Sequence, residues 1–168
     1  MKSKQRLSRP GPRIGQKAPG FSLPDAEGKQ RSLEEFVGPA VALLAFFPFA
    51  FSGVCDKEMC VFRDGFDDLS APTTQVVGIS VDSVFTLKAF AQTYDLQFPL
   101  LSDFNRLVTR LYGVVQERWV GFDYDGVAKR SVFLVDKKGS LRYKWVADAP
   151  SNEPPYEEVA EAVARLKD

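Results

Sequence analysis

Residues 41–55 read VALLAFFPFAFSGVC, and this stretch carries the strongest local signal of the fold. The run VALLAFF at 41–47 is short and almost continuously apolar, which is typical of a β-strand covered on both faces. Pro48 ends that run, and apolar residues then recur at roughly helical spacing over 54–69. We therefore predict a buried strand followed at once by a helix.

Cys55 falls in the first turn of the predicted helix, after the pair Ser52-Gly53, which offers an N-cap. The free backbone N–H groups and the positive end of the helix dipole favour an anion at this position. We therefore expect the pKa of the Cys55 thiol to lie below its ordinary value, so that the thiolate forms at neutral pH.

The composition predicts one globular domain. The chain has 168 residues, enough to bury a core without metal or disulfide staples, and contains 22 basic and 22 acidic residues. This balance gives no general attraction to nucleic acid or to an anionic membrane. No segment approaches the ~20 apolar residues of a membrane span or has the apolar stretch of a secretory signal, so we expect a cytoplasmic protein. Residues 1–14 are expected to form a flexible basic leader before a single domain at 15–168.

The absence of histidine excludes several kinds of site. Triad hydrolases need an imidazole base, and most zinc and haem sites need an imidazole ligand. Two cysteines alone complete neither a four-cysteine zinc site nor an iron–sulfur cluster. Redox chemistry or simple burial remains for the two sulfurs, and we expect no cofactor.

Downstream of the cysteine helix, the hydrophobic pattern alternates between strands and helices. Strands are expected at 75–81, 98–101, 131–136 and 140–146, and helices at 84–94, 105–112 and 154–166. The last two strands flank a short turn at 137–139 and predict a hairpin. This order predicts an α/β fold whose central mixed β-sheet has helices on both faces.

The spacing Pro48-x-x-x-Ser52-x-x-Cys55 resembles the active-site signature of the peroxiredoxins, which are thiol-dependent peroxidases. Three further segments resemble the family's N-terminal hairpin, the end of its central strand and its arginine strand: 18–25, 98–103 and 130–136. The resemblance covers roughly 15–146. It implies the thioredoxin-like fold, with the cysteine helix leaving the end of a central strand.

The resemblance also implies roles for five residues. Cys55 would be the peroxidatic cysteine, and Pro48 would shield its thiolate and shape the peroxide slot. The Ser52 hydroxyl would bond the peroxide oxygen, unless the same oxygen caps the helix. Arg130 would keep Cys55 ionised and bind the oxygens as charge develops, although a rim arginine is ordinary at a strand start. Glu58 would pair with Arg130, or else remain a solvated carboxylate in the first turn of the helix.

Four phenylalanines precede or follow Pro48, at positions 46, 47, 49 and 51. Side chains of this kind most often pack in a core. Phe49 and Phe51, however, lie within the motif loop, where they would line an apolar mouth suited to alkyl hydroperoxides.

Cys60 determines the subclass, and two interpretations remain. Its spacing from Cys55 resembles that of the resolving cysteine in the Q type, the bacterioferritin comigratory proteins. The stretches 47–55 and 98–103 instead resemble the one-cysteine alkyl hydroperoxide reductase E type, in which Cys60 would be a packing residue. Residues five apart in a helix have Cα atoms roughly 8–9 Å apart, too far for a disulfide, so a resolving Cys60 requires the helix to unwind.

We expect the Cys55 thiolate to reduce hydrogen peroxide and organic hydroperoxides and to become a sulfenic acid. Cys60 or an external thiol would then form a disulfide, which a thioredoxin-like or other dithiol reductant would reduce. Expected partners are this reductant and the hydroperoxide, with no nucleic acid and no membrane, in a monomer or homodimer. The alternative is a thioredoxin-like exchange or binding protein without peroxidase activity, although the chain lacks Cys-x-x-Cys.

Overall fold

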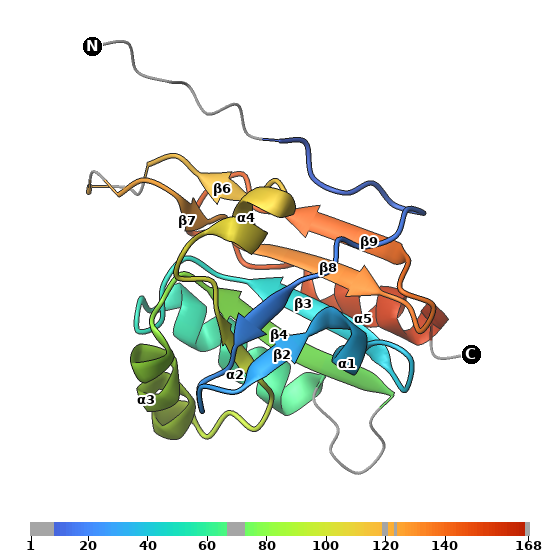
Figure 1. The fold of residues 1–168 in the computed structure, drawn as a ribbon, viewed down its shortest axis with the longest axis horizontal. Coiled ribbons are helices and arrows are strands. Elements are labelled where there is room, and N and C mark those ends of the chain that lie inside the picture. Colours follow the sequence, from blue (N-terminus) through green and yellow to red (C-terminus); the bar gives the residue numbers. More distant parts are fainter. Residues whose placement is uncertain (1–8, 67–72, 119–120, 123, 167–168) are drawn as a thin grey trace.

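A five-stranded sheet forms the centre of the molecule (Figure 1). The computed structural model describes residues 9–66, 73–118, 121–122 and 124–166. The strand order is β5-β4-β3-β8-β9. These strands are β3 (Val41–Phe46), β4 (Thr74–Ser80), β5 (Leu100–Ser102), β8 (Ser131–Val135) and β9 (Leu141–Val146).

Strand β3 occupies the middle of the sheet, and its neighbours run in opposite directions. It pairs in parallel with β4 and antiparallel with β8, so that Phe46 at its end lies opposite Ser131 at the start of β8. Strand β5 runs parallel to β4, and β9 runs antiparallel to β8. All six residues of β3 are buried, as its continuous apolar pattern predicts. The predicted mixed sheet is confirmed.

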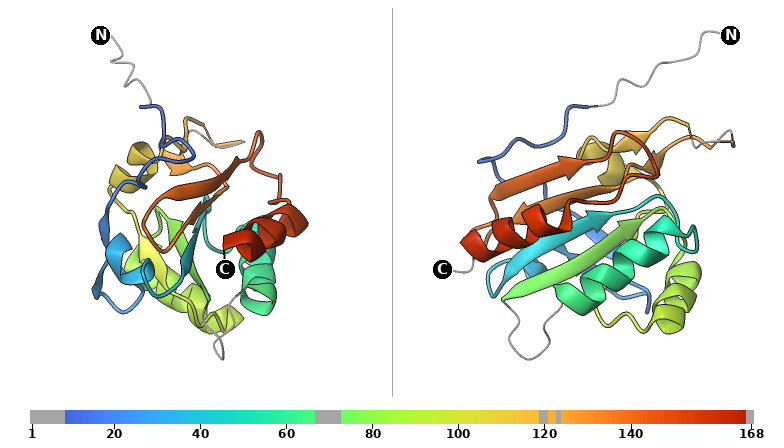
Figure 2. Two further views of the ribbon diagram at one scale, coloured as in Figure 1. Left: turned by 90° about the vertical axis from the view of Figure 1, so that its right-hand side faces the viewer. Right: turned by 180° about the vertical axis from the view of Figure 1, so that it is seen from behind.

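Helices cover both faces of this sheet (Figure 2). Apolar side chains of α2 (Val54–Gly65), α3 (Val84–Tyr94) and α5 (Tyr156–Leu166) belong to one hydrophobic cluster. Those of the short helices α1 (Leu33–Phe36) and α4 (Leu107–Leu111) belong to the cluster on the other face. Side chains alternate along β3 between the two clusters, which explains why this strand has no polar face.

Two small hairpins lie outside the central sheet. The first joins β1 (Ser22–Pro24) to β2 (Gln30–Ser32), in agreement with the expected N-terminal hairpin, although β2 lies beyond the segment that predicted it. The second joins β6 (Val115–Gln116) to β7 (Val127–Ala128) and was not predicted. Its strands precede Arg130, so this hairpin is positioned next to the arginine strand.

The predicted bounds of α3 are confirmed at both ends. At its N-terminal end the Ser83 hydroxyl accepts a hydrogen bond from the Thr86 backbone N–H. Helix α4 begins two residues later than predicted, because the buried Asp103 carboxylate accepts the backbone N–H groups of Val108 and Thr109. Helix α2 ends at Gly65, and Leu69, where the prediction ended, lies outside the described residues.

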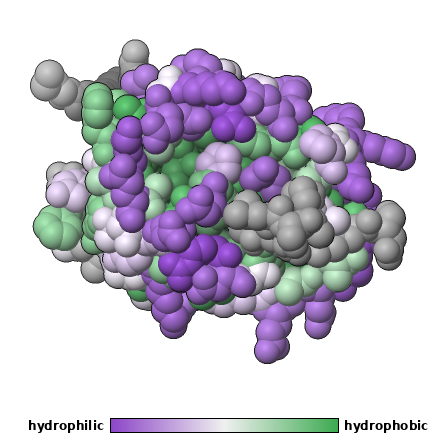
Figure 3. Space-filling view, turned by 90° about the horizontal axis from the view of Figure 1, so that it is seen from below, coloured by the Kyte–Doolittle hydropathy of each residue, from purple (hydrophilic) through white to green (hydrophobic). Residues whose placement is uncertain are grey.

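The described part of the basic leader lies against the body. Pro12 is buried, and its carbonyl accepts a hydrogen bond from Lys144 Nζ at 3.3 Å. Gly15 and Leu141 then pair through their backbones. The boundary at position 14 between leader and domain stays a prediction. Among the described residues no helix is long and apolar enough to cross a bilayer. Figure 3 shows polar side chains around one face of the molecule and apolar ones gathered in its middle.

Candidate active site

The loop between β3 and α2 places Cys55 at the start of a helix beside the centre of the sheet. After Phe46 the chain passes through Pro48, which is buried, and turns at two residues with positive φ, Phe51 at 62° and Gly53 at 70°. Gly53 is the N-cap of α2, a position where its positive φ would strain a larger residue. This turn directs the Cys55 side chain into the protein, where it is fully buried.

Two side chains donate hydrogen bonds to the Cys55 sulfur. The Ser52 hydroxyl lies 2.9 Å from Cys55 Sγ, and Arg130 Nη2 lies 3.2 Å from it. Arg130 reaches the sulfur because β8 is paired with β3, which brings the residue before Ser131 to the end of β3. The structure thus places Ser52 and Arg130 on the thiol from two different elements.

Arg130 is itself held by a buried ion pair with Glu58, whose Oε2 accepts from Arg130 Nη1. Both side chains are almost completely buried. Arg130 Nη2 also donates to the Pro150 carbonyl at 3.2 Å, in the segment that leads to α5. The alternatives of a rim arginine and a solvated Glu58 are therefore wrong for this chain.

Burial raises the pKa of the Cys55 thiol above its ordinary value, and this effect outweighs four that lower it. The opposing effects are the charge of Arg130, the Ser52 hydrogen bond, a hydrogen bond from the Phe49 backbone and the hydrogen bond from Arg130. The expected lowering of this pKa is therefore wrong for the closed site. The helix start favours the anion, but the expectation took no account of the loss of water around the sulfur.

Burial likewise raises the pKa of Glu58, to about 7, although the Arg130 charge opposes the rise. The second carboxylate oxygen of Glu58 is buried and has no hydrogen-bond partner. This carboxyl is consequently the group near the thiol whose protonation changes around neutral pH.

Ser52 does not cap the helix through its side chain. Gly53 takes the N-cap position, and α2 has no side-chain cap hydrogen bond. The Ser52 hydroxyl instead lies 2.7 Å from the Phe49 carbonyl oxygen and 2.9 Å from Cys55 Sγ. Its single proton serves one acceptor at a time, so the hydroxyl donates to the sulfur when the sulfur is ionised and is free to donate to Phe49 otherwise.

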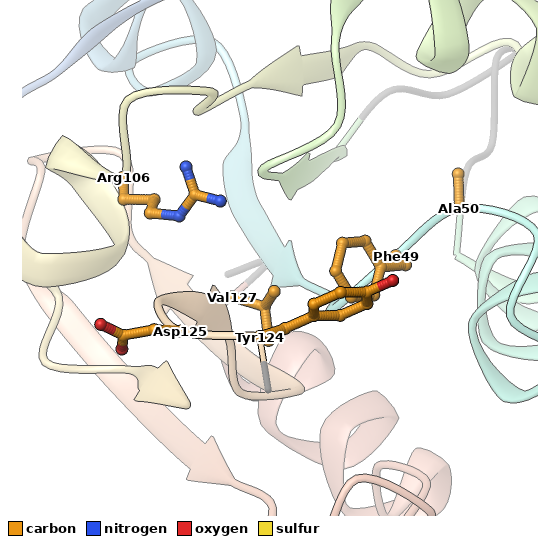
Figure 4. Close-up of a pocket in the computed structure, with 6 residues that line it drawn as sticks. All are labelled: Phe49, Ala50, Arg106, Tyr124, Asp125 and Val127. Atoms are coloured by element: carbon orange, nitrogen blue, oxygen red, sulfur yellow. The ribbon is translucent and has the colours of Figure 1, made fainter. Parts of the chain in front are cut away.

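A cavity of about 550 Å³ opens beside the loop that carries the thiol (Figure 4). Its lining residues are Phe49, Ala50, Arg106, Tyr124, Asp125 and Val127. Phe49 is thus at a mouth, as its place in the loop suggested. Phe51 instead packs against Phe90, with ring centroids 5.2 Å apart, and Phe46 and Phe47 are core residues.

Cys60 lies half-buried on the same helix as Cys55, and both cysteines are free. Three residues between them bind other elements. Asp56 accepts from the Tyr94 hydroxyl at 2.7 Å, Lys57 pairs with Glu153 at 3.0 Å, and Glu58 pairs with Arg130. Unwinding this turn of α2 would therefore break several contacts at once.

Sequence reasoning missed two contributors to the site. Asp82 follows β4, and its carboxylate accepts the Ala50 backbone N–H at 2.8 Å, which holds the motif loop. Its place after a strand parallel to β3 was a usable signal, because parallel strands end at the same edge of a sheet. Arg106 and its neighbours in the cavity gave no such signal.

In the described part of the chain, no group of three His, Cys, Asp or Glu side chains is placed to hold a metal ion.

Comparison with known proteins gives one consistent answer. Residues 14–144 match the model of the AhpC/TSA family. A putative peroxiredoxin bcp from Coxiella burnetii is 42% identical over 133 residues, which cover 79% of this chain and 87% of that protein. Peroxiredoxin Bcp from Escherichia coli is 39% identical over 132 residues, covering 78% of this chain and 83% of that protein.

Solved structures agree with the fold. Peroxidoxin BcpB from Mycobacterium tuberculosis superposes with a TM-score of 0.76 at 27% identity, covering 92% of this chain and 96% of that one. A peroxiredoxin-like protein from Aquifex aeolicus reaches a TM-score of 0.84 at 24% identity, covering 95% and 90% of the two chains. The expected thioredoxin-like fold is confirmed.

Proposed function

This chain belongs to the AhpC/TSA family, and from that membership and the geometry around its thiol we propose that Cys55 is the peroxidatic cysteine. The protein is a thiol-dependent peroxidase of the peroxiredoxin kind, most similar to the Q type among the subclasses considered. The observation that carries the assignment of Cys55 is the position of its sulfur between Ser52 and Arg130 at the start of α2.

In the proposed reaction the Cys55 thiolate attacks the terminal oxygen of a hydroperoxide. An S–O bond forms, the O–O bond breaks, and the leaving oxygen takes the electron pair and then a proton to become water or an alcohol. Cys55 is left as a sulfenic acid. Arg130 and Ser52 supply N–H and O–H donors where negative charge develops, which is the arrangement that stabilises such a transition state.

The raised pKa of the closed site fits this scheme, because the peroxide brings its own polar oxygens to the sulfur. Those oxygens replace part of the lost hydration and offset the desolvation that disfavours the thiolate. Pro48 is buried in the same loop, and its proposed role is to shield the thiol from water. Substrate entry should therefore favour the thiolate relative to the substrate-free site.

Cys60 is proposed as the resolving cysteine, on the strength of the similarity to the Bcp peroxiredoxins. Its thiolate attacks the sulfenic sulfur of Cys55, water leaves, and an intramolecular disulfide forms. A dithiol reductant of the thioredoxin kind then restores both thiols by exchange. We also propose that the protein acts in the cytoplasm, as a monomer or a homodimer.

Intact mass after one equivalent of hydrogen peroxide tests the scheme. A loss of two hydrogens reports the disulfide, and a gain of one oxygen reports a sulfenic acid that Cys60 does not resolve. Peroxide consumption with a dithiol checks turnover. A chain whose mass does not change and which consumes no peroxide would instead be the exchange or binding protein.

A further inference from the structure

The cavity beside the thiol loop has no part in the chemistry described so far. It begins at Phe49 and Ala50 and extends to the start of α4 and to the strand β7. Hydrogen peroxide fills only a small part of about 550 Å³. The space is of the size that ordinarily holds a small organic molecule.

Phe49 belongs both to the wall of the cavity and to the loop that carries the thiol. The Phe49 carbonyl lies 2.7 Å from the Ser52 hydroxyl that touches the sulfur, while the Phe49 ring lines the cavity. To reach this space, the organic part of a hydroperoxide whose O–O group lies at Cys55 would have to pass Phe49.

One wall of the cavity is aromatic. The Phe49 and Tyr124 rings meet edge to face with centroids 5.7 Å apart, and Phe122 stacks on Tyr124 at 5.1 Å. Val127 adds an aliphatic surface. Such a wall favours an apolar or aromatic body rather than a polar one.

Arg106 supplies a cation to the same space, and the fold holds its stem in place. Its backbone has φ of 61° at the N-cap of α4, and its side chain passes against Gly126. A Cβ at Gly126 would come within 2.8 Å of Arg106 Cδ, so the glycine allows this close approach. Figure 4 shows the guanidinium extending toward the side where Phe49 and Tyr124 lie.

The guanidinium retains unused hydrogen-bonding capacity. Its Nη1 donates to the Phe104 carbonyl at 2.9 Å, while its buried Nε has no hydrogen-bond partner. No carboxylate of the described residues lies within ion-pair distance of it. A half-buried arginine with no counter-ion among the described residues, at the end of an aromatic cavity, suits a carboxylate ligand.

We propose that Arg106 determines substrate specificity, by binding the carboxylate of an organic hydroperoxide whose apolar body lies against Phe49 and Tyr124. This proposal rests on the peroxidase function of Cys55. It separates the two ends of the substrate: the peroxide group lies at Ser52 and Arg130, and the anionic group lies at Arg106.

Asp125 weakens the attraction of the cavity for an anionic substrate, and this provides a second test. Its exposed carboxylate lines the same cavity and repels an anionic substrate. Asp125→Asn should therefore improve the reduction of a carboxylated hydroperoxide, the opposite of the effect expected from removing Arg106.

The probes are cumene hydroperoxide carrying a para carboxylate, its methyl ester, and hydrogen peroxide, each used to oxidise the full-length reduced protein in stopped-flow experiments. The wild type should react faster with the carboxylate than with the ester. Arg106→Gln should lose that preference by about tenfold, the usual effect of a charge-assisted hydrogen bond. Arg106→Lys should retain part of it, and Arg110→Gln, on the same helix but outside the cavity, should change nothing.

The three probes distinguish failure of the peroxidase function from failure of the Arg106 proposal. If the wild type reacts with none of the three probes, the peroxidase function itself is wrong. If it does react, but the carboxylate and ester are reduced equally or Arg106→Gln leaves their ratio unchanged, the role of Arg106 is wrong. Far-UV circular dichroism reports whether Arg106→Gln is folded, and Arg106→Lys serves the comparison if it is not.

Discussion

Arg130 Nη2 lies 3.2 Å from Cys55 Sγ, although 75 positions separate the two residues in the chain. The contact depends on the antiparallel pairing of β3 with β8, which sets the start of one strand against the end of the other. The charge that favours the thiolate is thus supplied by the sheet, while the sulfur is supplied by the helix.

Replacing Cys55 with serine should abolish peroxidase turnover, whereas Cys60→Ser should leave the first oxidation step nearly unchanged. Only Cys55 lies between Ser52 and Arg130, while Cys60 is one and a half turns further along α2. Stopped-flow fluorescence measures this step, with Trp145 as a half-buried reporter packed against the core. Trp119, a second possible reporter, lies outside the described residues. Rapid oxidation of Cys55→Ser would overturn the assignment.

Arg130→Met should raise the pKa of Cys55 still further and slow peroxide attack by about a hundredfold or more. The variant removes the charge that lowers this pKa and one of the two donors at the sulfur. Thiolate absorbance against pH and oxidation rates measure the two effects. Arg142→Met is the matched control, because Arg142 pairs with Asp136 at the surface. Equal rates in the Arg130 and Arg142 variants would show that Arg130 has no part in the chemistry.

Wild-type stability should fall as pH rises from about 5 to 7.5, and Glu58→Gln should lack this component. The pKa of Glu58 is about 7 in the fold against an ordinary value of 4.5. The folded state therefore holds a proton that the unfolded state has released, and stability present below pH 4.5 is lost as pH passes 7, by up to about 3 kcal/mol.

Urea unfolding of the reduced proteins at several pH values measures this difference. Glutamine cannot titrate, so the two curves of unfolding free energy against pH should converge or diverge across this range rather than run parallel. Parallel curves would mean that Glu58 stays ionised in its pair with Arg130 throughout.

Oxidation should unwind α2 between the two cysteines, because a regular helix keeps their Cα atoms about 8–9 Å apart. The residues between them include three polar ones, Asp56, Lys57 and Glu58, and each of these is bound to another element. Hydrogen exchange of peroxide-treated protein should therefore quicken over 56–61 and also at their partners Tyr94 and Glu153. A stable sulfenic acid on Cys55, with unchanged exchange and a free Cys60, would favour the one-cysteine interpretation.

The elements predicted well from the sequence carry their own signals. Strand β3 is uniformly apolar, and α3 has its capping serine and its spacing within one short segment. Helix α1 and strands β2, β6 and β7 have two to four residues each, too few for a period to show, and tertiary contacts hold them. Helix α4 starts late because the Asp103 carboxylate, four residues before the helix, accepts backbone N–H groups of its first turn.

The residues of the site could be predicted from the sequence, but the direction of the pKa shift of Cys55 could not. The motif and the arginine strand pointed to Cys55, Ser52 and Arg130, which the structure brings together. The pKa of the thiol was misjudged because burial depends on elements packed around the helix, which no local pattern encodes. Arg106 was missed for the same reason, since its cavity exists only once β7 lies beside the motif loop.

The pairing of Phe46 with Ser131 also determines which changes of chain length this enzyme can accept. The turn at 136–140 closes the β8–β9 hairpin at the end of the sheet remote from Cys55, so an added residue there alters the local contact of Gly139 with Ala18 and leaves the β3–β8 register intact. A residue deleted within β8 would shift the register by one and direct alternate side chains to the opposite face. Insertions at the turn should therefore be accepted. Deletions within β8 should disrupt the packing of the core and move Arg130 away from Cys55.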